Sequence, residues 1–431
     1  MLQPLCRHRR YRYLVNIQAG AGWSLTRAAT VQQLVVSPQN TGTDYANYLP
    51  SPILATNHKC PSKHAFTTIT HQPTFMKLFA TFTTACCALL ATYAFAVEEE
   101  TKSIDQLYAD AITEGGKLVM YHGGDFSMQQ ESLHEAFTAA FPEINFTLIV
   151  DYSKYHNVRI DNQLETDTLM PDLVALQTLQ DFPRWAQEGK LLEYKPANFS
   201  QVYDGFRDQR GAYMAYMMFT FSFLYDSSVL GGVAAPVSPA NLVEPQWTGK
   251  IASTHPTDDD AVLFVYKLYV EKYGWNWVED FANQNVTFRR GSNTANDLVV
   301  AKDKVVGVGT YTTGAPNVTF VTDNGNEYLA WGQRIAILNK AKHPAAAKLF
   351  MNWAISEEVQ KTVVAENVRV DLAANGGSSH PWEICKANVD EFPKFMADRE
   401  SVEQWRQTFA LYFGEVQGEP TPGFLGLYPG L

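Results

Sequence analysis

Apolar positions follow two alternating patterns along the chain after about residue 100. Short runs that are apolar almost throughout, such as 117–121 and 172–176, predict buried strands. Between them lie segments with apolar residues three or four positions apart, such as 103–115 and 155–166, which predict amphipathic helices. Strands that alternate with helices are typical of parallel βαβ units, so we expect a doubly wound α/β fold.

One such unit, residues 247–274, combines a short strand (250–253), a polar loop (254–257) and a helix. Three carboxylates, Asp258 to Asp260, open the helix, where they favour the free amides and the positive end of the helix dipole. A strand, a loop and a helix start together form a usual place for a ligand to meet backbone amides. We therefore expect a small molecule to contact the protein here.

Two longer strands interrupt this rhythm. Within 216–225, phenylalanines alternate with other residues, which predicts a long half-buried strand, and 327–338 offers a second one. Two long strands that bracket an inserted α/β unit would let the chain cross to a second lobe and return. The expected organisation is a first lobe at 97–215, an inserted second lobe at 216–326 and a return segment of the first lobe at 327–365. We expect the C-terminal segment, 366–431, to pack on the lobes and to hold one helix at 401–413.

The N-terminal part has a different character. Residues 76–96 hold one lysine, then an uncharged run that ends in Ala-Phe-Ala, the pattern of a secretory signal peptide with the mature start at Val97. The alternative is an uncleaved signal-anchor helix, since about 20 apolar residues span a bilayer. Residues 1–75 are polar and aperiodic. We interpret them as a disordered extension outside the natural product, the alternative being an Arg-rich organellar presequence.

Charge is divided between these parts. Residues 1–96 hold eight of the chain's 34 Lys and Arg but one of its 45 Asp and Glu, so the remainder carries 26 basic against 44 acidic side chains, a formal charge of −18. Such a surface repels nucleic acid and anionic membranes, and we exclude both as partners of the mature protein.

Glycosylation sequons also indicate secretion, and the cysteines agree with the division of the chain at residue 96. Four N-x-S/T sequons lie downstream of the signal peptide, which indicates a secreted, extracellular glycoprotein; they begin at Asn145, Asn198, Asn285 and Asn317. Cys385 is the one cysteine after residue 96. We therefore expect no disulfide in the mature protein and no cysteine-based metal site.

Catalytic motifs are missing from the sequence. It contains no H-E-x-x-H, no G-x-S-x-G and no phosphate-binding Walker loop, and the Gly307-Val-Gly309 segment lacks the third glycine of a dinucleotide fingerprint. A hydrolase that uses two carboxylates is compatible with the composition, but no spacing picks out such a pair. We expect a protein that is not an enzyme and holds no cofactor.

Five segments carry a resemblance to a known family: GGKLVMYHGG (115–124), MPDLVAL (170–176), PQWTGKIASTHPTDDDAVLF (245–264), RRGSNTANDLVVAKDKVVGVGTY (289–311) and NKAKHPAAAKLFMNWAISEEVQ (339–360), the last being the most specific. In this order they resemble the type II extracellular solute-binding proteins of ABC transporters, in the branch of ferric-iron and small-solute binders. The sequons fit secreted, fungal-like members of that group. The resemblance covers about residues 103–367.

This resemblance implies two doubly wound α/β lobes, joined by hinge strands, that close on a solute in the cleft between them. The ligand-facing positions that it implies are Tyr121, His122, Gly123, Asp125, Gln177, Thr178, Thr257, Asp258, Asp259, Arg290, Ser292, Asn293 and Tyr311. Acids in the cleft would favour a cation or a metal, whereas Arg290 would favour a carboxylate or a phosphate.

Ferric iron is one solute that the resemblance implies, with Asp125 and Tyr311 as its ligands. Iron-binding members have an acid after the third strand and a pair of adjacent tyrosines, whereas this chain has Gln177 and a single tyrosine. Ferric iron prefers anionic oxygens, and this set supplies few of them. We expect a secreted protein that captures a metal ion or a small organic molecule by hinge closure, the alternative being a secreted interaction scaffold with a degenerate cleft.

Overall fold

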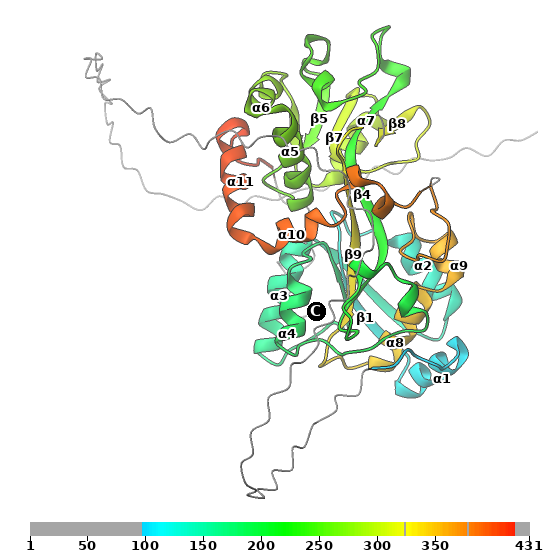
Figure 1. The fold of residues 1–431 in the computed structure, drawn as a ribbon. Coiled ribbons are helices and arrows are strands. Elements are labelled where there is room, and N and C mark those ends of the chain that lie inside the picture. Colours follow the sequence, from blue (N-terminus) through cyan, green and yellow to red (C-terminus); the bar gives the residue numbers. More distant parts are fainter. Residues whose placement is uncertain (1–96, 323–324, 377–378, 419–431) are drawn as a thin grey trace, which may run out of the picture. The chain divides into compact units, whose positions relative to one another are not determined.

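A mixed sheet forms the centre of the fold (Figure 1). The computed structural model describes residues 97–322, 325–376 and 379–418. In these residues the strand order is β2-β1-β3-β9-β4-β7-β5-β6, and β8 pairs with β4. The strands are β1 (Lys117–Gly123), β2 (Asn145–Asp151), β3 (Leu173–Leu176), β4 (Met214–Asp226), β5 (Ile251–Thr254), β6 (Thr287–Arg289), β7 (Val306–Thr310), β8 (Val318–Val321) and β9 (Leu329–Ile337).

The first lobe is built on β2, β1 and β3, which run parallel. Successive residues of β1 point to opposite faces: Leu118 and Met120 join one hydrophobic core, while Val119 and Tyr121 contact another. Helices cover both faces, as in a doubly wound sheet. They are α1 (Ile104–Glu114), α2 (Glu131–Ala140), α8 (Pro344–Ala354) and α9 (Glu357–Thr362) on one face, and α3 (Ser153–Glu165) and α4 (Asp181–Gln187) on the other.

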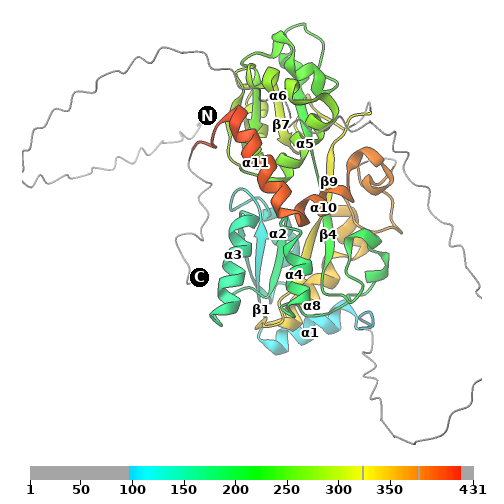
Figure 2. The same cartoon turned by 60° about the vertical axis from the view of Figure 1, so that its left-hand side comes forward.

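The second lobe is built on β7, β5 and β6, also parallel. Its helices are α5 (Asp260–Tyr273), α6 (Trp275–Ala282) and α7 (Ser292–Val300). Two C-terminal helices, α10 (Glu391–Ala397) and α11 (Arg399–Phe413), contact α5 and bury Phe392 and Phe409 in the core of this lobe (Figures 1 and 2). The C-terminal segment is therefore part of the second core.

Two long antiparallel strands, β4 and β9, take part in both lobes (Figure 2). Met214 of β4 and Ile335 of β9 lie in the core of the first lobe, whereas Phe223 of β4 and Leu329 of β9 lie in the core of the second. The chain thus crosses between lobes within continuous strands. A bend of these strands would move one core relative to the other.

The expected fold class is confirmed: the structure has two doubly wound α/β lobes that share long strands. Helix α10 was not expected, because it is only seven residues long and contains a proline, so its periodicity is weak. The proposed extension (1–75) and signal peptide (76–96) lie outside the described residues. In the described ranges, no helix is long and apolar enough to cross a membrane.

The expectation for Cys385 is wrong. Cys385 is disulfide-bonded in the structure, and its partner lies outside the described residues. The sequence places Cys6, Cys60, Cys86 and Cys87 before the expected mature start at Val97, so the prediction did not include this bond.

Candidate functional site

A cavity of about 250 Å³ lies where β4 and β9 pass between the two lobes. Loops and helix starts of the first lobe contribute Gly123, Gly124, Asp125, Phe126, Gln129, Gln130, Tyr152, Ser153 and Gln177. The shared strands contribute Met217, Phe219, Phe221, Trp331 and Gln333, and the second lobe contributes Asp259, Ser292 and Tyr311. The volume is below the roughly 300–1,000 Å³ of drug-sized pockets, so the cavity suits a small metabolite.

The floor of this cavity is one face of the β4–β9 ladder. Phe219 lies directly opposite Trp331, and Met217 lies directly opposite Gln333. Residues two positions apart in a strand share a face, which brings all four side chains to the cavity. The Trp331 indole donates to the Gln333 side-chain oxygen at 3.1 Å, which fixes the orientation of both groups.

Aromatic rings form a connected wall above this floor. The ring of Phe221 lies at right angles to that of Trp331, with centroids 5.0 Å apart, and is stacked near Tyr311 at 6.3 Å. Phe392 of α10 lies behind Trp331, at 5.9 Å between ring centroids. Helix α10 therefore supports one side of the cavity.

Asp125 of the first lobe bonds directly to the second lobe. It follows the carboxyl end of β1, and its carboxylate accepts hydrogen bonds from the Ser292 amide at 2.7 Å and the Ser292 hydroxyl at 2.5 Å. Ser292 is the first residue of α7, so the carboxylate occupies the positive end of that helix. Burial raises the pKa of Asp125, while the two bonds from Ser292 oppose this rise.

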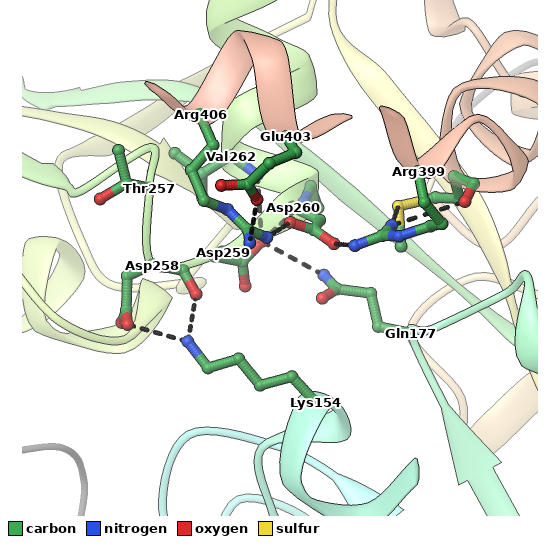
Figure 3. Close-up of polar contacts among 12 residues, drawn as sticks. Lys154, Gln177, Thr257, Asp258, Asp259, Asp260, Val262, Arg399, Glu403 and Arg406 are labelled. Carbon is green, nitrogen blue, oxygen red and sulfur yellow. Dashed lines mark hydrogen bonds and ion pairs between the residues drawn. The ribbon is translucent and has the colours of Figure 1, made fainter. Parts of the chain in front are cut away.

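The three consecutive acids have different partners (Figure 3). Asp259 is the N-cap of α5 and accepts from the amides of Ala261 at 2.7 Å and Val262 at 3.0 Å. The same carboxylate lines the cavity. Burial, together with the negative charge of Asp125, raises the pKa of Asp259 to about 7.

Asp258 connects the lobes. Its buried carboxylate accepts from Arg290 at 2.8 Å and from Lys154 at 2.9 Å, and Lys154 also donates to the Asp258 backbone oxygen at 2.5 Å. Lys154 belongs to α3 of the first lobe and reaches across to the loop before α5 (Figure 3). Asp260 instead pairs with Arg399, at 2.9 Å, and with Arg406, which ties α5 to α11.

Gly291 lies at a close approach between the two lobes. Its φ is +73°, and a Cβ built there would lie 3.3 Å from the Asp125 Cβ and 3.4 Å from the Tyr152 hydroxyl. Both neighbours belong to the first lobe. A glycine at this position satisfies the backbone conformation and the close approach at the same time.

The expected site residues fall into three groups. Gly123, Asp125, Gln177, Asp259, Ser292 and Tyr311 line the cavity together. Thr257, Asp258 and Arg290 belong to the loops around it, and Asn293 belongs to the first turn of α7, where it accepts from the Tyr311 hydroxyl at 2.5 Å. Sequence reasoning missed Phe219, Phe221, Trp331 and Gln333, although alternation along the two long strands marks them as residues that share a face.

Tyr121, His122 and Thr178 are buried and do not line the cavity. Strand β1 continues to Gly123, two residues beyond its expected end, so Tyr121 and His122 are still paired to β2. The His122 ring donates from Nδ1 to the Gly123 carbonyl at 2.6 Å and accepts at Nε2 from the Tyr216 hydroxyl at 2.5 Å. Burial lowers the pKa of His122 to about 4, which keeps the ring neutral.

No cluster of three or more His, Cys, Asp or Glu side chains suited to a metal ion occurs in the part of the chain that the structure describes. Asp125 and Tyr311, the ligands expected for ferric iron, do line the same cavity. Burial raises the pKa of the Tyr311 hydroxyl above its ordinary value, which disfavours the phenolate that iron prefers. Iron binding stays a prediction.

Comparisons with known proteins agree with this architecture. Residues 170–375 match the model of a bacterial extracellular solute-binding protein family. No curated protein sequence matches the chain significantly. Iron-bound HitA from Pseudomonas aeruginosa is similar in structure, with 17% identity and a TM-score of 0.53 over 68% of this chain and 99% of that one.

Two further solved structures are similar to this chain. One is the substrate-binding protein of an ABC transporter from Agrobacterium tumefaciens, with 13% identity and a TM-score of 0.58 over 70% of this chain and 95% of that one. The other is AfuA from Actinobacillus pleuropneumoniae with fructose-6-phosphate bound, with 18% identity and a TM-score of 0.53 over 69% and 99%. The expected resemblance to type II solute-binding proteins is confirmed, and the fold is theirs.

Proposed function

We propose that this protein captures a small solute in the cavity between its lobes and holds it by hinge closure. The observation that carries this proposal is the pair of hydrogen bonds from Ser292 of the second lobe to Asp125 of the first, at the wall of the cavity. These bonds hold the cavity closed from both sides. Opening it would exchange these polar contacts for contacts with water while β4 and β9 bend.

The nature of the contacts between the lobes supports reversible closure. Asp125 with Ser292, Lys154 with Asp258, and Gln177 with Asp259 at 3.5 Å are all polar. Polar interfaces of this kind separate at low cost, because water replaces the bonds that are lost. A solute that contacts both lobes would add the free energy that favours the closed form.

The structural neighbours add to this support. HitA was solved with iron and AfuA with fructose-6-phosphate, so both hold small solutes on this fold. By analogy we infer a binding protein without catalytic activity. Whether a transporter receives the solute is a separate question, and the proposal does not depend on it.

We also propose that the protein is secreted and N-glycosylated. All four sequon asparagines are exposed. Three of them, Asn198, Asn285 and Asn317, have positive φ values of 66°, 52° and 64°, which place them at turns. Surface turns are accessible to a glycosyltransferase without disturbance of the core.

A thermal-shift panel tests the binding function. Protein expressed from the complete chain is heated with organic cations, phosphorylated sugars, dicarboxylates, neutral sugars and ferric citrate. A compound at 100 times its Kd stabilises the folded state by about 2.7 kcal/mol, which raises the Tm by several degrees. We expect such a rise with one chemical class. No rise with any class would contradict solute binding and favour the interaction-scaffold alternative.

A further inference from the structure

The charge of the cavity wall has one sign. Two carboxylates, Asp125 and Asp259, line the cavity, and among the described lining residues there is no lysine, arginine or histidine. The remaining polar groups are hydroxyls and side-chain amides, which accept or donate without net charge. An anionic solute would therefore meet two carboxyl groups in the cavity and no cationic side chain to neutralise it.

Two cations beside the cavity already have partners. Lys154 donates to the side chain and the backbone of Asp258, and Arg290 donates to Asp258 and, at 2.9 Å, to the Gly418 carbonyl. The Asp258 carboxylate that joins them is almost fully buried, at 1% exposure. Removal of either cation to bind a solute would weaken the compensation of this buried charge.

Two helix N-termini of the second lobe, which are usual anion sites, are occupied by carboxylates of the chain. At the start of α5, the Ala261 and Val262 amides donate to Asp259. At the start of α7, the Ser292 amide donates to Asp125. Free amides at such positions bind phosphate and carboxylate groups in many proteins, but here carboxylates of the chain take that place.

Aromatic faces complete the wall opposite these charges. Phe221, Trp331 and Tyr311 line the cavity, and the ring of Phe221 lies next to each of the other two. The face of an aromatic ring attracts a desolvated cation, and apolar carbon atoms also pack well on it. An inorganic cation would instead need several oxygen ligands in one cluster.

From this arrangement we propose that the solute is a small organic cation whose ammonium group pairs with Asp259 while its carbon atoms pack on Phe221, Trp331 and Tyr311. This inference rests on the proposed solute-binding function and names its substrate class. Asp260, Lys154 and Gln177 lie around Asp259 (Figure 3), and Asp125 also acts on its charge. The Lys154 ammonium is held by Asp258, which leaves Asp259 as the counter-ion of the solute.

Calorimetric titration of the protein expressed from the complete chain tests this class. The probes are choline, its uncharged isostere dimethylbutanol, putrescine, thiamine, citrate, fructose-6-phosphate, glucose and ferric citrate. We expect one or more of the cations to bind, and choline, if bound, to bind at least ten times more tightly than dimethylbutanol. Binding of a sugar, an anion or iron without any cation would overturn the substrate class but leave the solute-binding function intact. Binding of no probe would contradict both.

The variant Asp259→Asn separates charge from structure. Asparagine caps a helix about as well as aspartate, so α5 keeps its N-cap while the cavity loses a negative charge. We expect the affinity for the bound cation to fall at least tenfold, with an unchanged circular dichroism spectrum. Asp303→Asn, which removes an exposed acid of the same lobe, is the matched control and keeps the wild-type affinity. Equal affinity of Asp259→Asn and the wild type would show that Asp259 is not the counter-ion.

Discussion

The Asp259 carboxylate is held in the folded protein at a cost in stability, and this cost depends on pH. Its pKa rises from the ordinary 3.8 to about 7 in the folded state. The folded state therefore binds this proton more tightly than the unfolded state does. The stabilisation from the proton is complete below about pH 4 and is lost as the pH rises through 7.

The size of the effect follows from the same values. Each tenfold change in proton affinity corresponds to about 1.4 kcal/mol, so a rise from 3.8 to about 7 sets an upper limit of about 4 kcal/mol. Because the carboxylate faces a cavity that water can enter, solvent screening reduces the destabilisation below this limit. We expect ionised Asp259 to lower the free energy of unfolding by about 1 to 2 kcal/mol. Asp259→Asn keeps the cap and removes the titration. At pH 8 the variant should therefore be more stable than the wild type by this amount.

Urea unfolding of both proteins at intervals from pH 4 to pH 8 measures this difference. Burial lowers the pKa of His122 and of His156, and their protonation destabilises the folded state as the pH falls. Both histidines are present in the two proteins, so their contribution cancels in the difference. The difference should be near zero at pH 4 and grow to its full value above pH 7. A difference that does not change with pH would refute the raised pKa.

Three further predictions concern closure and secretion. Lys154→Met removes the contact of α3 with Asp258 and should weaken solute binding about fivefold, or about 1 kcal/mol, as measured by calorimetry. The control Lys340→Met removes an exposed ion pair and should leave the solute affinity unchanged. Gly291→Ala should lower solute affinity, because the added Cβ would crowd Asp125 across the cleft. The control Gly189→Ala introduces similar backbone strain, with a φ of +69°, but has no atom within 4 Å of the added Cβ and should bind normally. Equal affinities of the two variants would contradict the role of the close approach. Peptide-N-glycosidase should reduce the apparent mass of the secreted protein, and a single Asn→Gln change at each sequon should reduce it stepwise; no change on treatment would contradict glycosylation. The four sequon sites are Asn145, Asn198, Asn285 and Asn317.

Local patterns were sufficient for most of the fold. The apolar spacing of 103–115 and the glycine at its end were enough to predict α1, without the capping box that Ser103 forms. The alternating phenylalanines of 216–225 predicted the long strand β4 that both lobes share. These features depend on neighbours within a few residues, which is why the sequence alone reveals them.

The cavity depends on contacts that local patterns do not contain. Asp125 and Ser292 are 167 positions apart, and their bond joins the two lobes. His122 was expected in a loop, but β1 continues through it because β2 and β3 supply partners on both sides. Likewise, the three acids at 258–260 look alike in the sequence. Their separate roles follow from Lys154, the α5 amides and the arginines of α11.

A crystal structure with the compound that raises the Tm most would test the central claim most directly. The account predicts electron density for one solute inside the cavity, in contact with Trp331 of the shared strands, Asp259 of the second lobe and Gln177 of the first. The Asp125–Ser292 bonds should be present in that complex. A compound bound outside the cavity, with the cavity filled by water alone, would contradict capture of a solute between the lobes.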